Sequence, residues 1–155
     1  MDPKFGLVAV GGTFDRFHRG HKAIVKKAFE IGRNVIIGLT SDEMAGKEVE
    51  PYELRKKVLV EFLERNGLSK RCDIVKLSDV YGPTLKDERI DAIVVSEETE
   101  PKAVEINRIR GKESLSPLEI VVVPFELAED RRPISSTRIK KGEIDREGRL
   151  ILWKG

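Results

Sequence analysis

Cysteine and histidine are scarce in this chain of 155 residues, which contains one cysteine and two histidines. The single cysteine, Cys72, excludes an internal disulfide bond. Even together with both histidines it would not complete the four-ligand set of a structural zinc site. We therefore expect no metal ion held by the protein's own side chains.

Long apolar runs and an excess of one charge sign are also absent. No stretch approaches the roughly 18 apolar residues of a membrane-spanning helix, and the N-terminus lacks a signal-peptide pattern. The 29 basic and 27 acidic residues leave a formal charge of only +2, without the concentrated positive field of a nucleic-acid-binding protein. We expect a soluble cytoplasmic protein that binds neither membrane nor nucleic acid. Its oligomeric state is left open by these data.

Short apolar runs alternate with longer amphipathic segments along the chain. The apolar runs are rich in Val, Ile and Leu, as in strands covered on both faces, and they occupy residues 5–10, 34–39, 73–77, 91–95 and 119–123. Helical spacing of apolar residues covers 20–31, 51–65 and, more weakly, 101–110. We predict a single α/β domain over residues 1–155, with a five-stranded parallel sheet and helices on both faces. Ligands of such sheets bind beyond the carboxyl ends of the strands.

The first predicted strand leads directly into a loop that contains Gly11 and Gly12 and ends at a helix start near Gly20. Glycines there let the backbone approach a ligand closely, and free main-chain N–H groups at a helix start suit phosphate. His18 and His21 lie three residues apart, hence side by side on a helical turn. Protonated, or as neutral N–H donors, both can meet one phosphate group. The alternative is an ordinary polar helix start, in which a histidine forms its hydrogen bonds within the protein and binds no ligand. The chain's only two histidines share this turn, however, which favours a phosphate site.

A second polar segment follows the fifth predicted strand, and a parallel sheet places it at the same edge as the glycine loop. It contains three consecutive hydroxyl residues, Ser135, Ser136 and Thr137, followed by Arg138 and Lys140. The hydroxyl groups can cap a helical turn and donate to phosphate oxygens, and the two cations add charge-assisted donors. Alone, such a cluster is equally typical of an ordinary helix cap. Beside the histidine loop it indicates a second part of one phosphate site.

The pair H-x-G-H at residues 18–21 and I-S-S-T at 134–137 resembles the signature of the nucleotidylyltransferase superfamily. Members of that superfamily share a Rossmann-like α/β fold and transfer a nucleotide monophosphate from a triphosphate with release of pyrophosphate. A third block, formed by residues 79–84, 94–99 and 106–107, resembles phosphopantetheine adenylyltransferases of the archaeal and eukaryotic type. The bacterial branch usually has Thr where this chain has His18. One departure is Lys140, which stands where the family motif has Arg and lacks the planar fork of a guanidinium.

This resemblance implies a doubly wound Rossmann-like fold and transfer of the adenylyl group of ATP to 4′-phosphopantetheine, giving dephospho-coenzyme A and pyrophosphate in coenzyme A biosynthesis. The acceptor phosphate attacks in line, without a covalent intermediate, and Mg²⁺ accompanies ATP through phosphate and water ligands. The implied catalytic residues are His18, His21 and Lys47. The implied ATP-binding residues are Gly12, Thr13, Phe14, His18, His21, Ser135, Ser136, Thr137 and Arg138, and the implied acceptor-binding residues are Thr13, Lys47, Ser96, Glu97 and Asn107.

Within these assignments, His21 donates to the α-phosphate, Thr13 orients the attacking phosphate and Lys47 holds the acceptor. Two alternatives stay open. A sister enzyme of the same fold would use FMN, nicotinamide mononucleotide or a phospho-alcohol as acceptor, with ATP or CTP as donor. A non-catalytic nucleotide-binding module is the alternative from another class.

Overall fold

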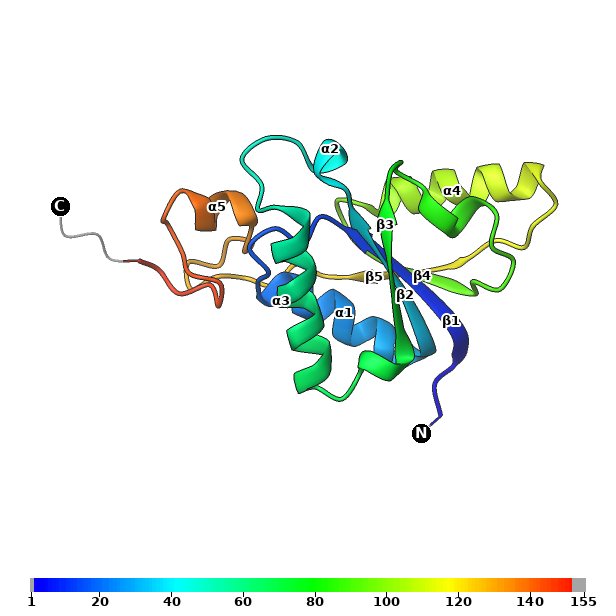
Figure 1. Cartoon of the computed structure of the whole chain (residues 1–155), viewed down its shortest axis with the longest axis horizontal. Coiled ribbons are helices and arrows are strands. Elements are labelled where there is room, and N and C mark those ends of the chain that lie inside the picture. Colours follow the sequence, from blue (N-terminus) through cyan, green and yellow to red (C-terminus); the bar gives the residue numbers. More distant parts are fainter. Residues whose placement is uncertain (1, 152–155) are drawn as a thin grey trace.

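Five parallel strands form one sheet in the order β3-β2-β1-β4-β5 (Figure 1). The structure, a computed structural model, describes residues 2–151. Each predicted strand is present, with bounds that shift by at most two residues at either end, and the predicted fold class is confirmed. The strands are β1 (Phe5–Gly12), β2 (Gly32–Thr40), β3 (Cys72–Leu77), β4 (Ala92–Ser96) and β5 (Glu119–Val123).

Helices cover both faces of the sheet, as predicted. On one face, α1 (Arg19–Ile31) and α3 (Tyr52–Arg65) pack with alternate residues of the central strands into one apolar core. On the other face, α4 (Glu100–Lys112) packs against the intervening residues in a second core (Figure 1). Val8 and Val10 face the first core, whereas Ala9 faces the second. This alternation buries β1 on both sides and explains its near-continuous apolar sequence.

The helix ends follow from local sequence. Pro51 is the N-cap of α3, and Gly67, just beyond its C-cap, adopts a φ of +68° that glycine tolerates without strain. Short elements that periodicity does not predict complete the fold. These are α2 (Asp42–Ala45), α5 (Ser136–Lys140) and the 3₁₀ turns η1 (Ser69–Arg71) and η2 (Gly82–Leu85). No helix of the described residues 2–151 is long and apolar enough to cross a membrane.

The chain begins in the middle of the sheet, so the strand order reverses between β1 and β4. Crevices for ligands form at such reversals, beyond the carboxyl ends of the strands. At this edge the loop after β1 meets the segment after β4. The long connection from β5 to α5 reaches the same edge (Figure 1). The fold therefore brings the predicted histidine and hydroxyl segments to one place.

Candidate active site

The loop between β1 and α1 is held in a constrained conformation. Phe14 and Arg16 both have positive φ angles, 52° and 49°, which cost roughly 1 kcal/mol or more for residues with a side chain. Glu50 and Asp15 hold this loop reciprocally. The main-chain N–H of Arg16 donates to Glu50 Oε1 over 2.8 Å, and the main-chain N–H of Glu50 donates to Asp15 Oδ1 over 2.9 Å. The loop is thus held in place by hydrogen bonds within the chain.

His18 and His21 stack, with ring centroids 3.6 Å apart and planes inclined by 19°. Nδ1 of His18 accepts the main-chain N–H groups of Gly20 and His21, and Nδ1 of His21 accepts that of His18. Because each Nδ1 is an acceptor, the proton of each neutral ring is on Nε2. A Cβ at Gly20 would lie 3.0 Å from Cε1 of His18, so glycine at the third motif position leaves room for the first ring.

The environment keeps both rings neutral. Burial lowers the pKa of His18 to about 4, the charge of Arg146 acts in the same direction, and Asp15 opposes them. Burial, followed by the neighbouring His18 ring, lowers the pKa of His21 to about 3. Of the two states left open by the sequence, the structure favours the neutral N–H donor over the imidazolium ion.

The expectation of free main-chain N–H groups at the start of α1 is wrong. His18 Nδ1 takes the N–H groups of Gly20 and His21, the N–H of Arg19 donates to Arg146 O over 3.0 Å, and that of Lys22 donates to His18 O over 3.0 Å. The first turn is capped by its own histidine. The main-chain N–H groups of this turn are therefore already hydrogen-bonded within the chain, whereas the imidazole Nε2–H groups are the donors that the turn can still offer.

The hydroxyl segment lies against the glycine loop. Ser136 Oγ donates to the main-chain oxygen of Asp15 over 2.6 Å, which fixes α5 to the loop. Ser135 Oγ is the N-cap acceptor for the N–H of Arg138 at 3.2 Å. Because Ser135 Oγ accepts this bond, its own hydroxyl proton stays available to a ligand. All three hydroxyl residues line one cavity together with both histidines.

The two cations that follow are engaged elsewhere, contrary to the expected phosphate-binding role of Arg138. Its guanidinium is only about one-tenth exposed, pairs with Asp130 and Glu143, and donates to the carbonyl of Pro133. The N–H groups of the Arg138 guanidinium are thus engaged in contacts that hold the segment before α5 in place. Lys140 lies at the surface, 3.8 Å from Glu48 Oε2, so the replacement of the family Arg by Lys falls outside the cavities.

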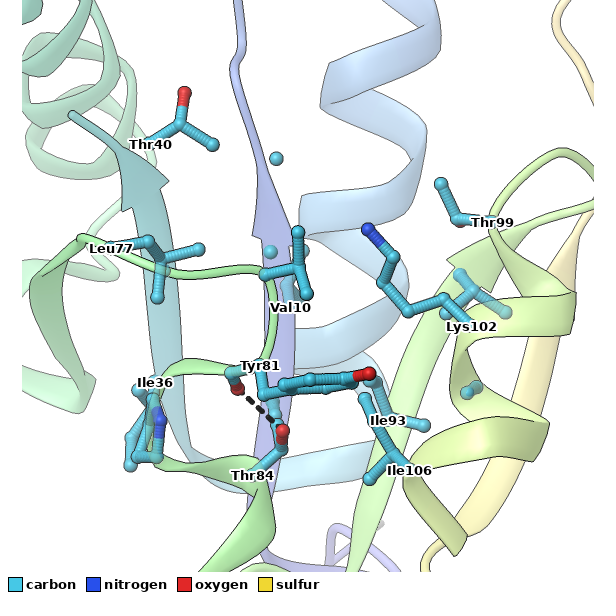
Figure 2. A pocket seen from close by; sticks show the side chains of 18 of the residues that line it. Val10, Ile36, Thr40, Leu77, Tyr81, Thr84, Ile93, Thr99, Lys102 and Ile106 are labelled. Atoms are coloured by element: carbon cyan, nitrogen blue, oxygen red, sulfur yellow. Dashed lines mark hydrogen bonds between the residues drawn. The ribbon is translucent and has the colours of Figure 1, made fainter. Parts of the chain in front are cut away.

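Two cavities adjoin at Thr13, which lines both. One, of about 400 Å³, is bounded by the histidines, the hydroxyl segment and the end of β5. The other, of about 290 Å³, is mainly apolar and runs between β1 and α4 as far as η2 (Figure 2). Its wall residues include Val10, Ile36, Leu77, Ile93 and Ile106. We call these the polar cavity and the apolar cavity.

A buried arginine that the sequence did not single out supports the point where the cavities meet. Arg55 of α3 has a side chain with no exposed surface. Its Nη1 donates to the main-chain oxygens of Thr13 and Thr40 over 3.0 and 2.9 Å, and Nε donates to that of Glu50 over 2.7 Å. Thr40 Oγ1 in turn donates to Thr13 Oγ1 over 3.1 Å. Since Thr13 Oγ1 accepts this bond, its own proton can point toward a ligand.

Other predicted residues divide between the cavities and their surroundings. Gly12 lines the apolar cavity and Ser96 the polar one, whereas Phe14 is buried and packs edge-on against His21 with centroids 5.3 Å apart. Asn107 is not a ligand-facing group, because its amide pairs with both main-chain polar atoms of Leu118, over 2.7 and 2.9 Å.

The predicted acceptor residues Lys47 and Glu97 are exposed and line neither cavity. Lys47 follows α2, whose Met44 does reach the apolar cavity. In place of Glu97 its neighbour Glu98 lines the polar cavity. Lys102, in the first turn of α4, lines the apolar cavity and was missed because one lysine on an amphipathic helix carries no distinguishing signal.

Comparison with known proteins extends this picture. Residues 9–142 match the cytidylyltransferase-like family. A phosphopantetheine adenylyltransferase of Methanopyrus kandleri is 50% identical over 146 residues, covering 92% of each chain, and one of Pyrococcus abyssi is 47% identical over 153 residues, covering 96% of this chain and 97% of its own.

This chain belongs to the phosphopantetheine adenylyltransferase family. The expected superfamily is confirmed as well, and these relatives favour the main interpretation over a sister enzyme or a binding module.

Solved structures agree with the fold of the family. A protein of unknown function from Archaeoglobus fulgidus aligns with a TM-score of 0.69 at 36% identity, over 75% of this chain and 87% of its own. A putative nicotinate-nucleotide adenylyltransferase from Vibrio parahaemolyticus aligns with a TM-score of 0.59 at 14% identity, over 89% of this chain and 80% of its own. The second likeness shows the fold alone. The nucleotidyltransferase fold thus holds across large changes of sequence.

Proposed function

We propose that the protein transfers the adenylyl group of ATP to 4′-phosphopantetheine, with ATP in the polar cavity and the pantetheine arm in the apolar cavity. The observation that carries this proposal is the position of Thr13, which lines both cavities and shares the polar one with His21. Reacting phosphates brought from the two sides would meet there. Such positioning is the main contribution that an enzyme makes to phosphoryl-type transfer.

The shape of the apolar cavity suits the proposed acceptor. A pantetheine arm is a narrow chain with amide groups, and the cavity offers mostly aliphatic walls with a few polar groups, such as the hydroxyls of Thr40, Thr84 and Tyr81. Figure 2 shows Tyr81 lying across this cavity beside Ile93 and Ile106. Tyr81 OH donates to Glu105 of α4 over 3.0 Å, which ties the loop after β3 to the helix.

In the polar cavity, Nε2–H of His21 is proposed to donate to the α-phosphate, with His18 beside it and the hydroxyls of Ser135 and Thr137 on the outer phosphates. Glu98 and Glu126 also line this cavity, and although Glu126 pairs with Arg19 over 3.5 Å, the carboxylate of Glu98 would repel a triphosphate that came without a cation. We therefore expect the substrate to be ATP with Mg²⁺, which neutralises phosphate charge when bound. Among the described residues, no cluster of three His, Cys, Asp or Glu side chains is arranged to hold a metal ion, so ATP itself would supply the inner ligands.

The proposed reaction needs no enzyme nucleophile. An oxygen of the acceptor phosphate forms a bond to the α-phosphorus as the bond to the bridging oxygen of pyrophosphate breaks. The acceptor is already ionised at neutral pH, since a phosphate monoester loses its second proton near pH 6. Neutral imidazole N–H groups then stabilise the charge that builds on the α-phosphate oxygens.

Incubation with ATP, Mg²⁺ and 4′-phosphopantetheine, followed by mass detection of dephospho-coenzyme A and pyrophosphate, tests this function. We expect both products with ATP and neither with CTP. Turnover only with FMN, nicotinamide mononucleotide or a phospho-alcohol would replace the acceptor but keep the chemistry. A folded, ATP-binding protein that is silent with every acceptor would indicate a binding module.

A further inference from the structure

Lys102 is the only charged residue among the described residues that line the apolar cavity. Within residues 2–151 the lining of the polar cavity includes no lysine or arginine, and its charged residues are Glu98 and Glu126, the second of which pairs with Arg19 outside the lining. With both histidines neutral, Lys102 is therefore the one cation that lines either cavity. Figure 2 shows its side chain extending from α4 over the cavity toward Val10 near the carboxyl end of β1.

The position of Lys102 in α4 is unfavourable for local stability. It is the third residue of the helix, where the positive end of the helix dipole disfavours a cation. It also forms none of the ion pairs found among residues 2–151. Glu100 in the same turn offsets part of this effect but forms no ion pair with Lys102. The exposed ammonium group of Lys102 therefore remains available to a ligand over the cavity.

Two anionic substrates have to approach each other at Thr13. A phosphate monoester carries a charge of about −1.5 to −2 at neutral pH, and the triphosphate beyond Thr13 is also negative. An ammonium group on a flexible four-carbon stem can neutralise the monoester and follow it as it moves. Hydroxyl groups such as those of Thr13 and Thr40 can orient the phosphate but cannot offset its charge.

We propose that Lys102 binds the phosphate of the acceptor and sets the preference of the apolar cavity for a phosphorylated pantetheine over pantetheine itself. This assignment rests on the proposed function and differs from the expectation for Lys47, which lines neither cavity. Lys102 is thus a binding residue for the nucleophile, separate from the histidines that face ATP.

A thermodynamic cycle tests the assignment. Calorimetry would measure the affinity of 4′-phosphopantetheine and of pantetheine for the wild type and for Lys102→Met. A charge-assisted contact of this kind is worth roughly a tenfold to hundredfold change in affinity. We expect Lys102→Met to lose that factor for the phosphorylated ligand and to bind pantetheine as the wild type does. Lys112→Met removes the same charge from the exposed far end of α4 and should change neither affinity.

Kinetics separate this proposal from the proposed function. If the wild type forms dephospho-coenzyme A, Lys102→Met should raise the KM for the acceptor while the KM for ATP is unchanged. Three results would overturn the assignment. The first is an equal loss of affinity for both pantetheine ligands, and the second is a rise in the KM for ATP alone. The third is a phosphate-dependent loss of affinity in Lys47→Met but not in Lys102→Met. A wild type that binds phosphopantetheine but makes no product would overturn the function alone, since the binding cycle would still report on Lys102. A wild type that does not bind it would overturn both.

Discussion

Nδ1 of His21 accepts the main-chain N–H of His18, and Nδ1 of His18 accepts the main-chain N–H of His21. Each ring therefore has a structural nitrogen, Nδ1, which accepts main-chain N–H groups at the start of α1, and a second nitrogen, Nε2, which carries the proton and which we propose donates to the substrate. The two functions of each ring can be separated by substitution, because Asn reproduces the position of Nδ1 and Gln approximates that of Nε2.

His21→Asn keeps an acceptor for the N–H of His18 and removes the donor to the α-phosphate. We expect a folded protein whose turnover falls by roughly a hundredfold or more, the usual cost of losing one transition-state donor. His21→Gln restores an N–H near the Nε2 position and should recover part of that loss. Steady-state kinetics with thermal unfolding as a control would check this. Near-normal turnover in His21→Asn would remove His21 from the reaction.

Both histidines should remain neutral from pH 8 down to about pH 5, because burial lowers the pKa of His18 to about 4 and that of His21 to about 3. The chain contains only two histidines, so NMR of tag-free protein would show two imidazole signals. We expect neither to shift across this range. A midpoint near pH 6.5 for either ring would contradict the buried, neutral arrangement.

The same lowered pKa values make folding stability depend on pH. Below pH 6.5 the unfolded chain takes up protons that the native histidines do not, so the free energy of unfolding falls as pH falls. The slope is at most about 1.4 kcal/mol per pH unit for each histidine. Carboxylates with a lowered pKa, such as that of Asp130, which is paired with Arg138, add to the loss of stability as the pH falls. Urea unfolding at pH 7 and pH 4.5 should therefore show a smaller difference for the His18→Asn/His21→Asn double variant than for the wild type.

Replacing Arg55 should lower the free energy of unfolding far more than replacing a surface arginine does. Arg55→Met leaves the main-chain oxygens of Thr13, Thr40 and Glu50 without their donor, and breaking a buried charged network of this kind costs about 3–5 kcal/mol. Arg65→Met, at the exposed end of the same helix, should cost less than about 0.5 kcal/mol. Urea unfolding of both variants measures the contrast. Equal effects would mean that the buried contacts of Arg55 contribute little.

The sequence predicts the sheet and its helices well because strands buried on both faces, such as β1 and β4, appear as short, nearly uninterrupted apolar runs. It also predicts the histidine loop, where two rare residues share one helical turn beside glycines. It does not predict the partners of that loop. Arg55, Glu50 and Lys102 are charged residues among many, and only the fold shows that Arg55 and Glu50 contact the loop and that Lys102 lines the apolar cavity. Nor does the sequence predict the partners of Arg138, a cation beside three hydroxyl groups for which we expected phosphate binding and which pairs with Asp130 and Glu143 in the structure.

The wall of the apolar cavity offers a last test, at Gly82 beside Leu77. Gly82 has a φ of +53°, and an added Cβ would lie 2.3 Å from Cδ2 of Leu77, a side chain that lines the cavity. Gly82→Ala should displace Leu77 and raise the KM for the acceptor, while the KM for ATP stays unchanged because the polar cavity lies on the other side of Thr13.

Gly142→Ala is the matched control, since Gly142 has a φ of +77° with nothing within 4 Å of an added Cβ. Both variants carry the backbone strain of a non-glycine residue at positive φ, so comparing them isolates the effect of Leu77. If the two variants have the same acceptor KM, the acceptor does not occupy the space beside Leu77, and the proposed path of the pantetheine arm along β1 and η2 would have to be redrawn.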